Sequence, residues 1–217
     1  QKTLLLFLFS TTPFLLISQS NDAISYAEIN GQINYYEGIP PYDSLSVSVS
    51  EFGTSNHFYI NKAVEKDGRF HLKFPINRPQ EIHLFFGNNC ISFPFAPNYK
   101  ATFILDNRDF TSADYQPIKI QVKGDNALTI NYIIQFLHFY LTKNYNFFFK
   151  ENQRKQIELD GTEYGIYRLK IFDEHQYFLK EFLKENKIED TLFIQWAENK
   201  IQYKLVNDLH DFQYKKY

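Results

Sequence analysis

The sequence predicts an α+β protein, in which an antiparallel β-sandwich or barrel of about seven to eight strands is followed by a segment of three helices. Up to about residue 123, apolar residues alternate with polar ones, as in Ser44–Ser50, where every second residue is serine. This period of two is typical of strands with one wet face. From about residue 126, apolar residues recur every three or four positions, as in an amphipathic helix. Gly124-Asp125-Asn126 separates the two patterns, because glycine frees the backbone and Asp or Asn accepts the first free amides of a helix.

Residues 1–20 have the pattern of a secretory signal peptide. Lys2 precedes the apolar runs Leu4–Phe9 and Phe14–Ile17, and Ser18-Gln19-Ser20 follows them. A basic residue, an apolar stretch and small residues before a cleavage site are the marks of such a peptide. We therefore expect cleavage after Ser20 or Ser18 and export to the periplasm or the outer cell envelope. The alternative is an uncleaved membrane anchor, for which the interrupted apolar stretch is short.

The chain is expected to divide into three units. After the signal peptide, residues 21–124 form the β-sandwich-like domain, and residues 125–217 form a helical segment that packs on it or follows it. No apolar run after the signal peptide is long enough to span a bilayer. Residue 1 is Gln rather than Met, so we expect the sequence to lack its true start, and its end is open in the same way.

Within the β domain, Asp67-Gly68 is the strongest turn signal, because a tight hairpin turn needs residues that tolerate positive φ. It predicts a hairpin between a strand that ends near Val64 and a strand that carries Phe70, Leu72 and Phe74 inward. Later strands show further inward sets with a period of two, and these comprise Ile82, Leu84 and Phe86, the segments 90–95 and 101–106, and Ile118, Ile120 and Val122.

Three helices are expected after the junction. One member of Asp125-Asn126 caps the first, which runs to about Phe149 before a polar break from Lys150 to Gly161. The second begins near Thr162, and Thr191 caps the third. Their apolar stripes predict a small bundle that packs on the sheet or stands beside it.

The composition excludes one class of partner and leaves two interpretations of the aromatic residues. The formal net charge is −2, and no basic stripe with interleaved aromatic residues stands out, so nucleic acid is not an expected partner. Aromatic residues are abundant, with 23 Phe and 16 Tyr. These rings predict packing between structural layers or, as the alternative, an exposed aromatic binding surface.

The sequence contains no recognisable catalytic, metal-binding or cofactor-binding set. Cys90 is the only cysteine, so the chain has neither an intramolecular disulfide nor a Cys-x-x-Cys pair. We expect Cys90 to be a half-buried strand residue, with pairing to another molecule as the alternative. His71 and His83 are expected on the outward faces of neighbouring strands, solvated rather than bound to metal. His138 is expected in the core of its helix.

The remaining candidate groups have structural explanations. His175 follows Asp173-Glu174, but the His-Glu-x-x-His metal motif is absent. Glu189-Asp190 lies at a helix start, where the helix dipole accounts for acidic residues. Carboxylates paired only in space, as in glycosidases, would leave no trace in the sequence, so a hydrolase stays open as a third function.

Several short segments of the sequence carry a resemblance to a known family, and these are Val64–Leu72, Phe93–Asn98, Ala101–Asp106, Val122–Leu128, Phe193–Ala197 and Ile201-Gln202-Tyr203. In their order they resemble the N-terminal region of exported TlpA-type thioredoxin-like proteins of bacteroidete envelopes. In that family a β-rich domain with a "dG-F" hairpin, a "pgD"-like strand and a "Gd-a--N" junction precede a helical segment. A thioredoxin domain with Cys-x-x-Cys then completes the protein. The sequence departs from the pattern at Pro97-Asn98-Tyr99, which stands where the family has "pgD", and it contains no thioredoxin domain.

The resemblance implies that this chain is the exported, non-catalytic N-terminal region of a TlpA-type thiol–disulfide oxidoreductase. Its role would be positioning, partner recognition or dimerisation, and its partner would be a C-terminal thioredoxin domain or another envelope protein. No catalytic residue or cofactor is carried over, because the redox residues of the family lie in the missing domain. The alternative is a stand-alone binding or interaction protein of the envelope that uses an aromatic surface.

Overall fold

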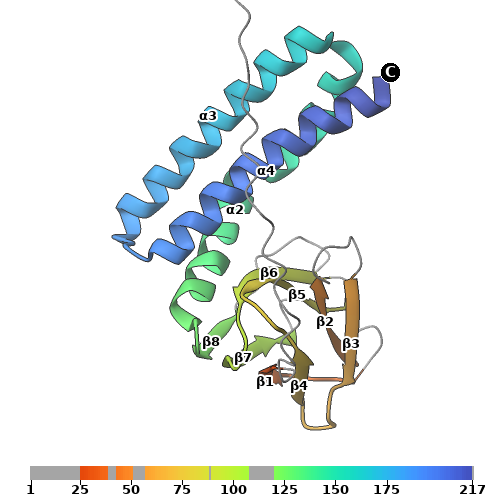
Figure 1. The fold of residues 1–217 in the computed structure, drawn as a ribbon, viewed down its shortest axis with the longest axis vertical. Coiled ribbons are helices and arrows are strands. Elements are labelled where there is room, and N and C mark those ends of the chain that lie inside the picture. Colours follow the sequence, from red (N-terminus) through yellow and green to blue (C-terminus); the bar gives the residue numbers. More distant parts are fainter. Residues whose placement is uncertain (1–24, 39–42, 51–56, 88, 108–119, 217) are drawn as a thin grey trace, which may run out of the picture.

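The structure is a computed structural model that describes residues 25–38, 43–50, 57–87, 89–107 and 120–216, with side chains described except at 140–150 and 216. The expected signal peptide (1–20) and the start of the last expected strand (Ile118) lie outside the described residues. The α+β prediction is confirmed, because two four-stranded sheets precede long helices (Figure 1). The described strands do not close into a barrel.

Each sheet combines strands that are distant in the sequence. Sheet A has the order β4-β1-β7-β8, and its strands are β1 (Tyr26–Asn34), β4 (Arg69–Pro75), β7 (Lys100–Asp106) and β8 (Gln121–Gly124). Sheet B has the order β3-β2-β5-β6, and its strands are β2 (Ser44–Ser50), β3 (His57–Ala63), β5 (Gln80–Phe86) and β6 (Asn89–Phe95). The expectation of a wholly antiparallel sheet is wrong at one place, because β1 pairs with β7 in parallel.

Aromatic rings from the two sheets meet in the core. Phe93 of β6 lies 5.4 Å from Phe103 of β7 between ring centroids, and Phe95 of β6 lies 6.1 Å from Phe74 of β4. Gly31 of β1 makes room for this packing, since a Cβ there would overlap the ring of Phe70. The period-two pattern therefore identified the inward residues correctly, and these strands bury phenylalanine where sheets A and B meet.

Asp67-Gly68 forms a tight turn but not the expected hairpin. Gly68 N donates to Glu65 O at 2.8 Å, and Glu65 N donates to Arg69 O at 2.8 Å. However, β3 before the turn pairs with β2, whereas β4 after it pairs with β1. The turn carries the chain from sheet B to sheet A, because each flanking strand finds its partner elsewhere in the sequence.

The Gly124-Asp125-Asn126 junction joins both sheets to the first described helix, α2 (Ala127–Glu158). Asp125 Oδ2 accepts from Lys100 N at 2.8 Å, and Asp125 N donates to Lys100 O at 2.9 Å. Asn126 Nδ2 donates to the carbonyl of Pro94 in β6 at 2.8 Å. The expected cap is wrong, because Asn126 occupies the N-cap position in the left-handed region without a capping side-chain bond. These side chains fix the direction of α2 instead.

The next turn of α2 is also bound to sheet A. The Asn131 side chain makes two hydrogen bonds to Val122 of the edge strand β8. Its Nδ2 donates to Val122 O at 2.9 Å, and its Oδ1 accepts from Val122 N at 3.1 Å. The first turns of α2 are therefore held against the sheets by polar as well as apolar contacts.

The polar break expected at 150–161 is wrong, because α2 continues through it to Glu158. Arg154 pairs with Glu158 at 3.6 Å at helical spacing, and such pairs stabilise a helix. The side chain of Asn152 also accepts a hydrogen bond from the Tyr164 hydroxyl at 3.0 Å. The polar residues thus serve packing against the next helix, which sequence periodicity alone does not reveal.

The last two helices form an antiparallel pair beside α2 (Figure 1). Helix α3 (Gly161–Asn186) begins with a capping box between Asp160 and Glu163. Helix α4 (Thr191–Lys216) is capped by Asp190 rather than the expected Thr191, because Phe193 N donates to Asp190 Oδ1 at 2.8 Å. None of the described helices has a stretch that is both long and apolar enough to cross a membrane.

Candidate functional site

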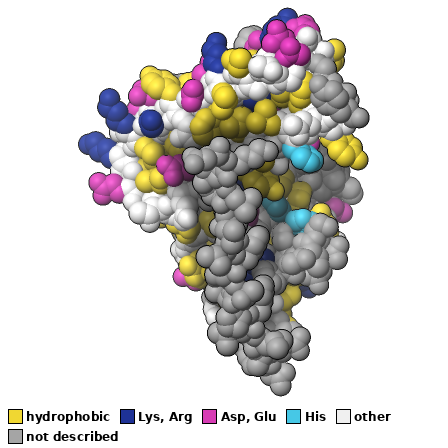
Figure 2. Space-filling model, turned by 45° about the horizontal axis from the view of Figure 1, so that its top comes forward, with side chains coloured by type: hydrophobic (Ala, Val, Ile, Leu, Met, Phe, Trp, Pro, Cys, Tyr) yellow, Lys and Arg dark blue, Asp and Glu magenta, His cyan; other side chains and the backbone are white. Residues whose placement is uncertain are grey.

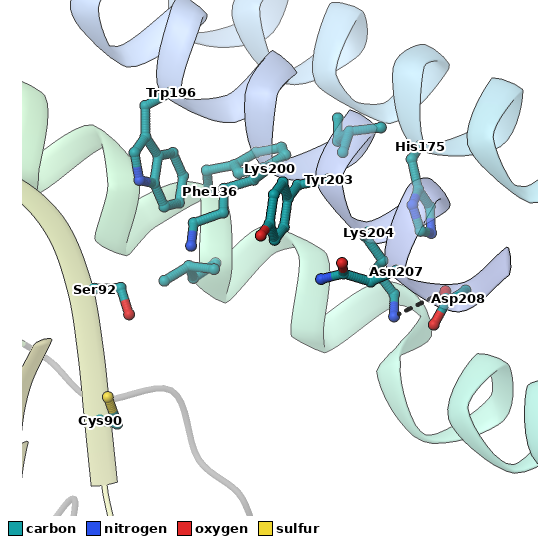
Figure 3. Close-up of a pocket in the computed structure, with 12 residues that line it drawn as sticks. Cys90, Ser92, Phe136, His175, Trp196, Lys200, Tyr203, Lys204, Asn207 and Asp208 are labelled. Atoms are coloured by element: carbon teal, nitrogen blue, oxygen red, sulfur yellow. Dashed lines mark ion pairs between the residues drawn. The ribbon is translucent and has the colours of Figure 1, made fainter. Parts of the chain in front are cut away.

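A cleft of about 540 Å³ lies between sheet B and the helices (Figure 3). Cys90 and Ser92 of β6 form one side, as Figure 3 shows, and the helices form the other. The helical lining is Phe136 and Leu137 from α2, His175 from α3, and Trp196, Lys200, Ile201, Tyr203, Lys204, Asn207 and Asp208 from α4. The cleft therefore combines residues from both halves of the chain.

Local periodicity explains why these side chains reach the cleft. In β6 the alternate residues Ile91, Phe93 and Phe95 point into the core, so Cys90 and Ser92 lie on the opposite face. In α4, one face is buried through residues such as Phe193 and Ala197. The residues Trp196, Lys200, Tyr203 and Asn207 recur at spacings of three and four on another face, which is the face that lines the cleft.

Glu81 of β5 ties α4 to sheet B at one end of the cleft. Its Oε1 accepts from Trp196 Nε1 at 3.1 Å, and its Oε2 lies 2.8 Å from Lys200 Nζ. Lys200 Nζ also lies 5.9 Å from the centre of the Trp196 ring. A second cavity of about 500 Å³ shares Trp196, Lys200 and Tyr203 with the first. These three α4 side chains therefore line both the cleft and the second cavity.

Three charged groups meet at the other end of the cleft. Arg168 of α3 is buried and binds Asp208 Oδ2 of α4. Lys204 Nζ lies 3.3 Å from the same oxygen, and Figure 3 shows this pair as a dashed line. Arg168 Nη1 also donates to Asn152 Oδ1 of α2 at 3.4 Å. One carboxylate is therefore shared by two cations, and the cluster links all three described helices.

His175 lies beside this cluster as a buried imidazole. Burial lowers its pKa to about 4, and the positive charges of Arg168 and Lys204 act in the same direction. His175 is therefore neutral at physiological pH. His138, by contrast, is exposed on α2, so the expectation that it lies in the core is wrong.

The buried His175 predicts a specific pH dependence of stability. The unfolded chain takes up this proton near pH 6.5, whereas the folded chain resists it down to about pH 4. The stability that depends on a neutral His175 is therefore fully present above pH 6.5, and it is lost as the pH falls towards 4. Relative to His175→Gln, the wild-type free energy of unfolding should fall by about 3 kcal/mol over that interval. Urea unfolding at several pH values tests this, and equal pH slopes for the two proteins would contradict it.

The outer face of sheet B carries a hydroxyl–imidazole pair next to the cleft. A ring nitrogen of His83 lies 2.6 Å from Ser92 Oγ. Burial lowers the pKa of His83, so the neutral imidazole is favoured. Such a pair can act as base and nucleophile when a third group orients the imidazole. Within the described ranges, no carboxylate is shown hydrogen-bonded to this ring. The antiparallel pairing of β5 with β6 places His83 opposite Ser92, so two adjacent antiparallel strands predicted from the sequence would have brought this pair together.

The other histidines do not form the expected arrangement. His71 lies in β4 of sheet A, where its ring nitrogen is 2.5 Å from Asn30 Oδ1, so it is not a neighbour of His83 in sheet B. His57 of β3 is the actual companion, with a ring-centroid distance of 6.3 Å to His83. In the part of the chain that the structure describes, no three or more His, Cys, Asp or Glu residues are grouped to hold a metal ion.

Cys90 is exposed rather than half-buried as expected. Desolvation by the adjacent walls raises the pKa of its thiol, and a hydrogen bond from Ser92 opposes this only in part. The thiol is therefore protonated at neutral pH. A protonated thiol is a weak nucleophile, which fits a lining group better than a reactive one.

The aromatic residues pack between structural layers, as expected, and the exposed aromatic binding surface stays a prediction. Many phenylalanines are buried, whereas several tyrosines are exposed, among them Tyr59, Tyr177, Tyr203 and Tyr214. Figure 2 shows hydrophobic side chains interspersed with charged ones over the helical part. Tyr203 is the exposed tyrosine that also lines the cleft.

A scan against protein-family models, a search of curated proteins and a search of solved structures each found no match for this chain.

Proposed function

We propose that the chain is an exported recognition module whose cleft between sheet B and α4 holds a ligand or a segment of a partner. The observation that carries this proposal is the cleft itself, with a volume of about 540 Å³ and walls from both halves of the chain. Small-molecule sites have volumes of about 300–1,000 Å³, and most have an apolar lining with a few fixed polar groups.

The geometry supports a cleft that exists before any ligand arrives. Glu81 connects sheet B to Trp196 and Lys200 at one end. The Asp125 and Asn126 bonds to Lys100 and Pro94 hold the start of α2 against the sheets. A preformed cleft binds more tightly, because less order has to be imposed on binding.

We further propose that the module belongs to a TlpA-type thiol–disulfide oxidoreductase of the cell envelope and positions its substrate or partner. The order of sandwich, junction and helices supports this, as do the motifs around Asp67-Gly68 and Gly124-Asp125. The chain has one cysteine, so a thioredoxin domain elsewhere would supply the dithiol. The second candidate is a stand-alone binding protein of the envelope, and the exposed cleft tyrosine Tyr203 favours it equally.

Recognition through the cleft is tested by asking what co-purifies with the native protein. Protein isolated from envelope extracts under native conditions should release about one small molecule or peptide per chain on denaturation. Cys90→Trp fills the cleft and should abolish this co-purification. Thr102→Trp, at an exposed strand position of sheet A away from the cleft, is the matched control and should retain it. An unchanged yield from Cys90→Trp, or nothing released from the wild type, would refute the proposal.

The intact mass of the native protein separates the two candidates. A mass well above 25.9 kDa, by about the size of another domain, supports the oxidoreductase. A mass slightly below that value supports the stand-alone binding protein and removes the thiol–disulfide role. In either case this polypeptide alone should not reduce insulin disulfides, because it lacks a second thiol.

A further inference from the structure

We propose that the cleft takes a small amphipathic carboxylate, with its apolar body against Phe136, Leu137 and Trp196 and its negative charge between Lys200 and Lys204. This inference rests on the proposed function and names the chemical class of its ligand. The two lysines lie one helical turn apart and line the same cleft as the apolar side chains (Figure 3). An ionic group and an apolar body can therefore be accommodated together.

The charges around the cleft do not balance. Lys200 pairs with Glu81, whereas Lys204 and the buried Arg168 both contact the single carboxylate of Asp208. Among the ion pairs of the described residues, three cations thus face two carboxylates beside the cleft, an excess of one positive charge. The side chains of Lys200 and Lys204 are 42% and 51% exposed, so each keeps room for a further acceptor. One added carboxylate would neutralise the cluster.

The neighbouring groups also favour an anion. The positive charges of Arg168 and Lys204 disfavour a further cation beside them, and burial together with these charges lowers the pKa of His175. The Cys90 thiol, whose pKa is raised, is neutral and does not repel a carboxylate. Asn207 lies on the same lining and offers an uncharged hydrogen-bond donor.

The apolar part of the lining sets the nature of the ligand body. Phe136 and Leu137 of α2 line the cleft together with Trp196 and Tyr203 of α4. Aromatic walls of this kind bind flat or flexible hydrocarbon by removing it from water. Fatty acids and the carboxyl ends of apolar peptides share this combination of an apolar body and one negative charge, and the binding experiment distinguishes them.

Trp196 makes the proposal directly measurable, because it is the only tryptophan in the chain and it lines the cleft. Titration of the full chain with decanoate, below its micelle concentration, should give a saturable change in tryptophan emission. Bromodecanoate should quench this emission by contact. Decyltrimethylammonium, which has the opposite charge, and methyl decanoate, which has none, should bind at least about tenfold more weakly, because a charge-assisted hydrogen bond is lost. An acetylated Leu-Leu-Phe peptide with a free carboxylate serves as the peptide arm, and the tighter ligand identifies the source.

Charge variants provide the second test. Lys204→Gln and Lys200→Gln should each weaken decanoate binding about tenfold. Lys180→Gln, at an exposed position of α3 outside the cleft lining, should leave it unchanged. Glu81→Gln keeps an oxygen acceptor for Trp196 but removes a negative charge, so it should strengthen binding. If Glu81 served only to hold α4 against sheet B, Glu81→Gln would weaken binding instead. Circular dichroism confirms that each variant is folded.

The outcomes separate this inference from the proposed function. Equal affinity for decanoate and decyltrimethylammonium would overturn the carboxylate but leave the cleft as a binding site. If decanoate and the peptide both fail to bind, while a ligand sensitive to Cys90→Trp co-purifies, the chemical class is wrong and recognition by the cleft stands. If Cys90→Trp also changes nothing, both proposals fall.

Discussion

Replacing Arg168 by alanine should lower the free energy of unfolding by about 3–5 kcal/mol. The guanidinium is 3% exposed and binds Asp208, which is itself 13% exposed. Without Arg168, this carboxylate keeps only Lys204 as an ion-pair partner among the described contacts. Asn152 Oδ1 would lose one of its donors as well. A buried charge deprived of its partner costs more than the intact pair contributes, so the effect should be large. Urea denaturation at neutral pH measures it.

A double variant that removes both charges of the ion pair distinguishes a charge effect from a packing effect. Arg168→Met combined with Asp208→Leu removes both charges and replaces them with apolar groups of similar size. This double variant should recover most of the lost stability, because no unpaired charge stays buried. Lys170→Ala, at an exposed position of the same helix, is the control and should change stability by less than about 0.5 kcal/mol. If Arg168→Ala were as mild as this control, the ion pair would have no structural importance.

Phe193→Ala should lower the free energy of unfolding by a similar amount, about 3–5 kcal/mol. Phe193 is fully buried at the start of α4. Its ring centroid lies 5.8 Å from those of Tyr132 and Phe136 in α2, and 5.9 Å from that of Phe182 in α3. Truncation leaves a cavity where the three helices meet, and the surrounding rings can fill it only in part. Thermal or urea unfolding gives the value.

Leu192 provides a matched control for this substitution. It precedes Phe193 in α4 but is 40% exposed, so Leu192→Ala should lose only about 1 kcal/mol or less. The Phe193→Ala variant should also shift the emission of Trp196, whose ring lies 6.4 Å from that of Phe193. Equal stability losses in the two variants would mean that the helices do not share one core at this point.

Local patterns were sufficient to predict the type of each element but not the partners of the strands. The serine alternation of Ser44–Ser50 and the inward phenylalanines of Arg69–Pro75 identify strands, because period two reflects one buried face. Asp67-Gly68 correctly predicts a turn, but the predicted hairpin is wrong, since the strands on either side pair with β2 and β1 rather than with each other. Pairing depends on contacts across long stretches of chain, and no local pattern encodes them.

The helical half shows the same limit for polar residues. The stretch from Lys150 to Gly161 is polar, and this polarity predicts a break between helices. In the structure its first nine residues, up to Glu158, are the end of α2, where Asn152 and Gln156 bond to Tyr164 of α3. Only the position of the neighbouring helix explains why these residues are helical.

The cleft could not be predicted from the sequence at all. Lys200 and Lys204 look like an ordinary solvated face of α4, and Cys90 looks like a strand residue with no partner. Glu81 and Trp196, which are 115 positions apart, become neighbours only when the helices lie against sheet B. The sequence pattern bears only on a pair beside the cleft, because the antiparallel pairing of β5 with β6 places His83 opposite Ser92.

The two hydrogen bonds between Asn131 and Val122 have a consequence for the behaviour of the protein among other chains. A side-chain amide presents one donor and one acceptor side by side, as the backbone of a neighbouring strand does. Among the described residues, Asn131 therefore takes the place of a further strand beside Val122, at the β8 edge of sheet A. An uncovered edge invites pairing with another molecule and aggregation. By occupying the backbone N–H and C=O of Val122, a single asparagine from the first turns of α2 blocks strand pairing at that residue.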